Sequence, residues 1–500
     1  MADTKENKDV EMKEKGAEET TVENESMVVE DIRQNFAYLE KAVANFDPRF
    51  TLKVLRGLPA LRKKVTGNAL AKVIETTYPK DDSARDELLG YVKKASKDEQ
   101  GDESMDIDDQ AEATPPTTIL PEVDMFLYVL VQVWLLNLDE GKWLAEFKAL
   151  SESAARRLRG YNRRSLDYIA AKVWFYYARG MELTGMQESS RPVLLAALRT
   201  ATLRRDAETQ ASLITLLLRG YLATHKVSQA AALVAKTNFP ELASNSLAAR
   251  YLYYLARINA IQLNYSAAHE RVTAAVRKAP QTPQALGFLQ TAHKLRVVVE
   301  LLMGDIPERT TFREAQFEKP LLPYFEIARA VRVGDVGAFT EAVERHRATL
   351  KKDGNHGLVL RLRQNVIKTG IRIMSLTYSR ISLRDICVRL GLDSEESAEY
   401  IVAKAIRDGV IDASIDHEHG YMQSKEVLDV YSTTEPQDAF HDRINFCIQL
   451  HNDSVKSMRY TLSDNRIDLK SAEEAREREK ELVSEIQDGT DIDDDDDFEI

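Results

Sequence analysis

The sequence predicts an all-α protein: a helical-repeat solenoid of the tetratricopeptide type, a winged-helix module and C-terminal helices, with disordered acidic ends. Three observations lead to this prediction. Between about residues 118 and 350, apolar side chains recur at helical spacing with almost no strand-like alternation. Short turn sequences divide that stretch at intervals of roughly 30–45 residues, which fits one helix–turn–helix pair per repeat. From residue 380 to 423 the pattern changes to helix, helix and hairpin.

Charge separates a folded body from three acidic segments. The chain of 500 residues has a net charge of −12. Residues 1–27, 97–112 and 486–500 carry net charges of −5, −7 and −8, so the rest of the chain is +8. Blocks of like charge repel themselves and bury little apolar area, so we expect these segments to be disordered. Solvated tails are the simpler interpretation, and docking arms are the alternative.

Composition indicates a soluble protein from a reducing compartment. The two cysteines, Cys387 and Cys447, are too few for a disulfide framework. The acidic N-terminus lacks the apolar run of a signal peptide. No stretch reaches about 18 uninterrupted apolar residues, so no transmembrane helix is expected.

The expected domains follow from these boundaries and from Pro115 and Pro116, which cannot continue a helix. They are a disordered acidic N-terminus (1–27), an N-terminal helical unit (28–95), an acidic linker (96–117), tetratricopeptide-like repeats (118–355), a winged-helix part (356–425), C-terminal helices (426–485) and an acidic disordered tail (486–500).

The repeat region is predicted from its turns and its small residues. The turns are expected at Gly141, Gly185, Lys226, Asn264, Gly304 and Gly334. The clearest repeat covers 249–280, where Ala256, Ala268 and Ala275 fall where two helix axes must come within 8–10 Å, and Pro280 ends the second helix. An ordinary helical bundle is the alternative, but the even intervals favour stacked pairs.

A long helix over 356–378 is expected to lead into the winged helix, with Leu362, Val366, Ile373 and Leu376 facing inward. The shorter helices that follow it are predicted from the residues that begin and end them.

The winged helix is predicted from capping residues and glycine stops. Ser382 with Asp385 is expected to begin one helix, and Gly391 to end it. Asp393 with Glu396 is expected to begin the next helix. The module is completed by a strand over 410–415, a turn over 417–420 and a returning strand over 421–423.

Charge argues against nucleic-acid recognition by this module. Residues 393–408 would form the recognition helix, and their net charge is −3. A helix that reads a groove faces phosphates and needs positive charge. We therefore expect the wing to present a strand edge to another protein, with Ile415 and Tyr421 as candidate interface residues.

A C-terminal helix is predicted over roughly 437–459. Its apolar stripe repeats at steps of three or four residues and includes Phe440, Ile444, Ile448 and Val455. A second apolar face holds Phe446 and Leu450. From the residues alone, folding back onto the chain and insertion into a bundle with other chains are equally good explanations.

The candidates for a metal centre are weak. His417, His419 and Asp429 have a spacing that resembles the metal site of JAMM-type deubiquitinases. In that family the Asp comes one residue later and a proline follows the second His, whereas Gly420 follows it here. We expect a solvated turn instead.

Other sites for chemistry are not evident. Cys447 shares a helix with His441, but no third group orients them, so a core thiol is the simpler interpretation. We predict no catalytic residue, no cofactor and no metal. A basic patch beside Tyr161 holds Arg156, Arg157, Arg163 and Arg164. It is either a solvated helix face or a binding surface for an acidic peptide.

Several stretches resemble the non-ATPase regulatory subunit 3 family of the 26S proteasome. They occur in the family's order over roughly residues 30–480, and they are LRTATLR at 198–204, RYLYY at 250–254, NVIKTG at 365–370, AKAIRDGVI at 403–411 and YST at 431–433. The acidic ends resemble the family only in character.

This resemblance implies a PCI-domain protein, in which helical repeats are capped by a winged helix. It implies a non-catalytic scaffold subunit of the regulatory particle lid, acting in ubiquitin-dependent degradation in the cytoplasm and nucleus. The implied partners are other PCI subunits, a small acidic disordered lid subunit and, through a helical bundle, the deubiquitinase subunit. A PCI subunit of the signalosome or of translation initiation factor three is the closest alternative, and a winged-helix nucleic-acid binder is a more distant one.

Overall fold

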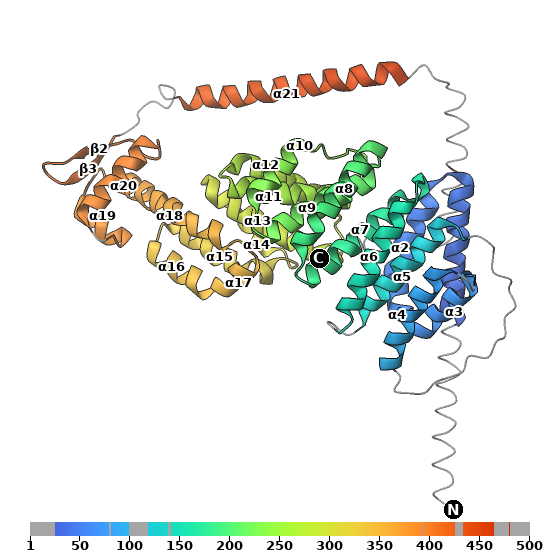
Figure 1. Ribbon diagram of the computed structural model, residues 1–500. Coiled ribbons are helices and arrows are strands. Elements are labelled where there is room, and N and C mark those ends of the chain that lie inside the picture. The colour runs from blue at the N-terminus through green and yellow to red at the C-terminus, as the bar shows by residue number, and fades with distance from the viewer. Residues whose placement is uncertain are drawn as a thin grey trace, which may run out of the picture. The chain divides into compact units, whose positions relative to one another are not determined.

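The computed structural model describes residues 26–79, 82–99, 119–138, 142–392, 394–425, 434–464 and 480. They fall into two compact units that divide between Ala292 and His293. Within both units, helices lie side by side in successive pairs (Figure 1). Of the sequence-based expectations, most of 1–27, most of the 96–117 linker and the whole 486–500 tail lie outside the described residues.

The first unit begins with helices that surround one apolar helix. They are a helix over 26–45, α2 (Pro48–Lys64), α3 (Gly67–Thr77), α4 (Ser83–Glu99) and the central α5 (Pro121–Asn137). Pro121 occupies the first helical position of α5, where a missing amide proton is tolerated. Nearly every side chain of α5 is buried, because its apolar residues run around the whole helix.

Paired helices follow in the same unit. They are α6 (Leu144–Gly160), the short η1 (Arg164–Leu166), α7 (Asp167–Leu183), α8 (Gln187–Arg204), α9 (Ala207–Ala223), α10 (Val227–Lys236), α11 (Asn245–Ile261) and α12 (Tyr265–Lys278). The predicted 249–280 repeat is α11 with α12, and Ala256, Ala268 and Ala275 are fully buried there. The predicted solenoid of tetratricopeptide type is confirmed.

The turns between paired helices share one backbone device. A residue with positive φ stands just before the next helix, as at Gly185 (72°), His225 (58°) and Leu263 (73°). The sequence prediction placed two of these turns at Lys226 and Asn264, the capping residues that follow the left-handed positions. A side chain at positive φ costs roughly 1–2 kcal/mol, yet His225 and Leu263 accept that cost, so glycine signals only some of these turns in the sequence.

Helix α13 (Leu286–Met303) contains the division between the units, and the second unit continues with further pairs. They are α14 (Arg309–Arg313), α15 (Glu318–Val333), α16 (Val336–Arg345), α17 (Arg347–Lys352) and α18 (His356–Thr377).

Helix α18 is fixed by two close contacts within the second unit. Asn365 donates from Nδ2 to the carbonyl oxygens of Leu301 (2.8 Å) and Leu302 (3.0 Å), which satisfies groups left open at the end of α13. The backbones of Gly334 and Gly370 touch, since a Cβ built on Gly334 would lie 2.6 Å from the Gly370 Cα. Only glycine permits this approach.

The winged-helix module follows α18. It consists of β1 (Arg380–Ser382), α19 (Leu383–Leu390), α20 (Glu395–Arg407), β2 (Ala413–Asp416) and β3 (Tyr421–Ser424). In the described residues the strands form one antiparallel sheet in the order β1-β3-β2. Ile381 and Ile415 both pair with Met422, and this face of the sheet packs on the module's apolar core.

Several details of the module differ from the prediction. Ser382 caps α19 and Gly391 ends it with φ 60°, as expected. The cap of α20 is Ser394, whose hydroxyl accepts the Ser397 amide, so the expected start at Asp393 was wrong. The strand begins at Ala413 rather than 410, because the Val410 amide is used to close the end of α20 by bonding to the Ala405 carbonyl.

The long helix before the module was predicted well in extent but not in its inward face. It spans His356–Thr377, and Leu362 and Val366 are buried. Ile373 and Leu376 are exposed, and Ile371 and Met374 take the buried positions instead. The helix therefore changes its buried face near Gly370, where the Gly334 turn crosses it.

The C-terminal helix α21 (Glu435–Asp464) is longer at both ends than the predicted 437–459. None of the helices in the described residues combines the length and apolar character that crossing a membrane requires.

Candidate interaction surfaces

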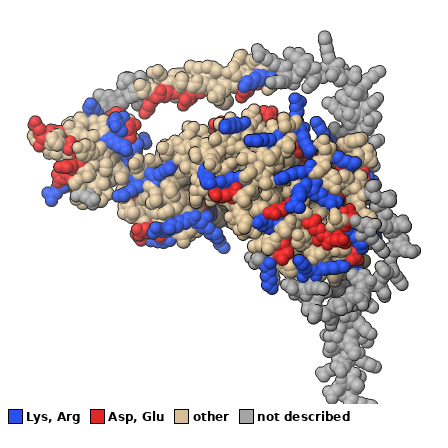
Figure 2. Space-filling model, in the orientation of Figure 1, with Lys and Arg blue, Asp and Glu red and all other residues tan. Residues whose placement is uncertain are grey.

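Helix α21 carries its large apolar side chains in solvent. Phe440, Ile444 and Ile448 of the predicted stripe are 62%, 56% and 52% exposed, and Val455 is half-buried. Phe446 and Leu450 on the second face are also exposed. Most of the surface of α21 that Figure 2 shows is neither acidic nor basic. Exposed apolar side chains gathered on one helix are typical of protein interaction sites, so α21 is a candidate interface.

The two residues chosen on the wing point to opposite faces of the sheet. Ile415 pairs with Met422 and packs against the module's core, so it contributes to stability. Tyr421 lies on the outer face, in register with Ser382 and Asp416, and the Arg380 guanidinium sits 3.8 Å from its ring centroid. Of the pair, Ile415 belongs to the core, and Tyr421 stays a candidate interface residue that is half-buried on the outer face.

The predicted basic patch is divided by buried carboxylates of α5. Arg157 donates from Nε to Asp124 (2.6 Å), and Arg163 reaches Glu122 (3.4 Å). Both carboxylates have side chains only 2% exposed. Arg156 and Arg164 remain exposed. Two of the four arginines therefore pair with α5 and stabilise the first unit, although the Arg163 side chain is itself 48% exposed.

The Asp124 carboxylate is the centre of a polar network inside the first unit. It accepts hydrogen bonds from Tyr78 (2.6 Å), Arg157 and Tyr161 (2.9 Å). Burial, together with Asp124, raises the pKa of the Tyr78 and Tyr161 hydroxyls well above their ordinary value. Burial lowers the pKa of Arg157, but the hydrogen bond and the charge of Asp124, together with Tyr128 and Tyr161, outweigh burial and raise the pKa overall. The network is charge-balanced and fully bonded, so it fixes α5 rather than forming a reactive centre.

Asp167 and Asp206 form a second pair of acidic residues, which among the described residues has no ion pair like that of Asp124 with Arg157. The sequence did not predict this pair. Asp167 begins α7, and Asp206 caps α9 by accepting the Thr209 amide (3.1 Å). Burial and then the nearby Asp206 raise the pKa of Asp167 to about 6. Arg164 and Arg204 act in the opposite direction. Neighbouring capping positions on adjacent helices would have been the sequence signal.

Within the described part of the chain, the candidate metal ligands and the candidate Cys–His pair do not contact one another. His417 pairs through Nδ1 with Glu399 (2.9 Å), and His419 pairs with Asp416 (2.9 Å), while Asp429 lies outside the described residues. His441 bonds Asn445, one turn along the same helix, rather than Cys447. Among the described residues, no group of three or more His, Cys, Asp or Glu is placed to hold a metal ion.

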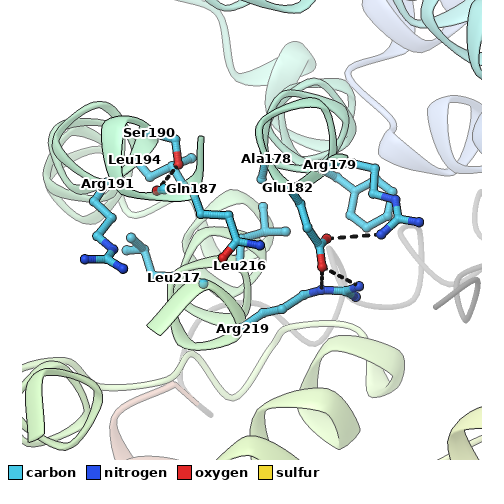
Figure 3. Close-up of a pocket in the computed structure, with 12 residues that line it drawn as sticks. Ala178, Arg179, Glu182, Gln187, Ser190, Arg191, Leu194, Leu216, Leu217 and Arg219 are labelled. Carbon is cyan, nitrogen blue, oxygen red and sulfur yellow. Dashed lines mark hydrogen bonds and ion pairs between the residues drawn. The ribbon is translucent and has the colours of Figure 1, made fainter. Parts of the chain in front are cut away.

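A small hollow between α7, α8 and α9 is shown in Figure 3. Glu182 is held on one side by Arg179 (3.1 Å) and Arg219 (3.1 Å). The cavity volume of about 30 Å³ is far below the roughly 150 Å³ of a cavity that binds benzene, so the hollow is too small for an organic substrate.

A surface at the end of α18 escaped the sequence analysis. Leu376 and Val388 are 80% and 75% exposed. Tyr378 joins α18 to α19, since its hydroxyl accepts a hydrogen bond from Arg389 (2.7 Å). The sequence predicts Leu376 on the inward face of α18, and this position around the helix axis was wrong. The exposed surface was missed for that reason.

Three family models cover most of the chain. A model described as PSMD3-like, N-terminal TPR repeats matches residues 24–328, and a PCI domain model matches 343–426. A third model, for the C-terminal part of a proteasome regulatory subunit, matches 429–496. The chain is 47% identical over 476 residues to the probable 26S proteasome regulatory subunit rpn3 of Schizosaccharomyces pombe, covering 95% of this chain and 93% of the relative.

This chain belongs to the 26S proteasome non-ATPase regulatory subunit 3 family. Two further members support the assignment. The probable 26S proteasome non-ATPase regulatory subunit 3 of Anopheles stephensi is 46% identical over 494 residues, 98% of this chain and 96% of the relative. The 26S proteasome regulatory subunit RPN3 of Saccharomyces cerevisiae is 39% identical over 452 residues, 86% of each chain. Its relatives are named as regulatory subunits, and the resemblance inferred from the sequence is confirmed.

The family models place the surfaces in context. The PCI model contains the whole winged helix, including Tyr421, and the C-terminal model contains α21. The first model contains the Asp124 network and all four arginines of the basic patch. Each surface therefore lies in a part of the chain that matches a model of the regulatory subunit 3 or PCI type.

Proposed function

We propose that this chain is a non-catalytic assembly subunit of the regulatory particle lid of the 26S proteasome, acting in ubiquitin-dependent protein degradation. Its family and its PCI domain support this function. The observation that carries the proposal is the exposed apolar surface of α21, because burial of such a surface is favourable and helices of partner chains can cover it.

The chemistry of the surfaces supports a specific set of partners. The α21 stripe suits a helical bundle shared with other lid chains, including the deubiquitinase subunit. The outer face of the winged helix around Tyr421 suits neighbouring PCI subunits. The exposed Arg156 and Arg164 suit the small acidic lid subunit. The complex would be found in the cytoplasm and nucleus, and catalysis would belong to its other chains.

A pair of charge substitutions on α21 tests the proposal. Ile444→Asp with Ile448→Asp places two carboxylates in the centre of the apolar stripe. We expect tagged chain carrying them to lose co-purification with the lid at least tenfold. The matched control is Asn445→Asp with Gln449→Asp, which adds two carboxylates at the same spacing on exposed positions of α21 away from Phe440 and should co-purify normally.

Folding is checked on the purified chains. Because residues 444 and 448 are exposed, their replacement should leave the circular dichroism and the melting temperature unchanged. Normal co-purification of the double variant would refute the role of α21. Mass spectrometry of the partners separates the lid from the signalosome and translation initiation factor three.

A further inference from the structure

The winged helix carries a second apolar surface away from the strands of the wing. We define the α18–α19 patch as Ile373, Leu376, Tyr378, Arg384, Val388 and Arg389. Ile373 and Leu376 lie one turn apart at the end of α18, and all four uncharged side chains are exposed. The hydrogen bond from Arg389 to Tyr378 links α19 to the residue that follows α18.

The patch combines its apolar centre with unneutralised positive charge. Arg384 and Arg389 are exposed, and Arg384 lies one turn before Val388 on α19. Arg389 also lies 5.1 Å from the centroid of the Tyr378 ring, which holds the guanidinium over the patch. Among the described residues, no carboxylate is within ion-pair distance of either arginine. Exposed Tyr and Arg around a large apolar residue are typical of binding hot spots.

Another part of the module has the opposite charge. Glu395 and Glu396 are exposed in the first turn of α20, and Glu418 is exposed in the hairpin turn. Acidic side chains appear at the hairpin end of the winged-helix lobe in Figure 2. The module is therefore bipolar, and its two charged surfaces call for different partners.

We infer that the α18–α19 patch docks an acidic surface with an exposed aromatic or aliphatic side chain on another lid subunit, independently of α21. The inference rests on the proposed function. Charge complementarity sets the partner's acidity, and the exposed Leu376 and Val388 require an apolar counterpart.

Two other occupants fit less well. Nucleic acid would be repelled by the acidic first turn of α20, and it would leave Leu376 and Val388 facing phosphate. A second copy could place the α20 face of one chain on the patch of another. Such a head-to-tail contact leaves a free patch at one end and a free α20 face at the other, so copies would form a ring or a filament, and a different chain is the simpler occupant.

A competition experiment measures the contact in the assembled complex. Cells would express a tagged wild-type chain together with a variant carrying Arg384→Glu and Val388→Glu. Mass spectrometry of isolated lid complexes then gives the ratio of the two chains. We expect the variant to be depleted at least tenfold, and the depletion to shrink in complexes assembled at high salt.

The substitutions are chosen to preserve the fold. Position 384 is in the first turn of α19, where a carboxylate favours the helix, and position 388 is exposed. A control variant, Arg347→Glu with Ala348→Glu, makes the same charge change at exposed positions of α17 and should incorporate at parity. A second test variant, Leu376→Ser, removes apolar area without changing charge and should also be depleted, by about threefold.

The outcomes separate the inference from the proposed function. If the wild-type chain enters the lid and the Arg384→Glu, Val388→Glu variant enters equally well, the inference is wrong and the proposed function stands. If the wild-type chain does not enter the lid, both are wrong. Patch-dependent self-association of the purified chain in sedimentation, or patch-dependent binding of a fluorescent 30-base-pair duplex with normal lid incorporation, would also overturn it.

Discussion

Helices α5 and α21 are both rich in large apolar residues, but α5 buries them within its own unit and α21 leaves them exposed. Almost every side chain of α5 is buried inside the first unit, and its two carboxylates find arginines there. On α21, the residues of the apolar stripe stay largely exposed. The hydrophobic effect is the same for both, so the difference lies in where the covering surface comes from.

The comparison separates residues that hold this chain together from residues that hold it to others. Replacing an α5 side chain should change folding and leave the affinity of correctly folded molecules alone. Replacing an α21 side chain should do the reverse. Two aromatic residues of the same type, Phe126 and Phe440, make the contrast testable.

The largest effect is expected for Phe126→Ala. Phe126 is fully buried and packs edge-to-face on Phe36, with ring centroids 6.3 Å apart. Its removal should lower the free energy of unfolding of the first unit by about 3–5 kcal/mol in urea titrations. Phe440→Ala, at a position 62% exposed, should change it by less than about 0.5 kcal/mol.

Equal losses for the two phenylalanines would break the comparison. It would mean that α21 already packs on its own chain in solution, which is the fold-back alternative raised by the sequence.

A smaller effect is expected when the charge of the α5 network is removed. Asp124→Asn keeps the shape of the side chain but leaves Arg157 without its closest carboxylate. Loss of one partner of a buried pair should cost about 3 kcal/mol in the same titration. Asp82→Asn is the control, since Asp82 is 3.9 Å from Arg157 and partly exposed, and it should cost no more than about 1 kcal/mol. Similar costs would show that Asp124 has no special role.

The smallest effect is expected at Asp167, where burial and the nearby Asp206 outweigh the opposing charges of Arg164 and Arg204. Its folded pKa of about 6 lies above the ordinary Asp value of about 3.9. The contribution of Asp167 to the free energy of unfolding is therefore fully present below pH 4 and is lost as the pH rises through 6. Asp167→Asn should raise the melting temperature by about 1–3 °C at pH 7–8, and this gain should vanish towards pH 4. A gain that does not depend on pH would contradict the prediction.

Periodicity was enough to predict the helical architecture and much of the winged helix. Glycine and serine at the ends of α19 are local signals, so the prediction there was correct. The cap of α20 was wrong by one residue because Asp393 and Ser394 are both good caps and only the fold chooses between them.

The surfaces were harder to predict, since exposure depends on contacts between distant segments. The spacing of Leu376 fits the stripe of Leu362 and Val366 and predicts burial, whereas the close approach at Gly370 changes the face that α18 buries. In the same way, Arg157 and Arg163 were interpreted as part of a free basic patch, because nothing local reveals the carboxylates of α5. The choice of Phe440, Ile444, Ile448, Val455 and Tyr421 as interface residues remains a prediction.

The contact between Gly334 and Gly370 has a mechanical consequence. With no side chain between them, two backbones meet directly, and nothing at that point can flex by changing rotamer. A force applied to the winged helix by a neighbouring chain would be transmitted through α18 to the α15–α16 turn with little local deformation. Helices α15 and α16 would then move with the winged-helix module as one rigid body. A displacement imposed on the module by a partner would therefore also displace these helices.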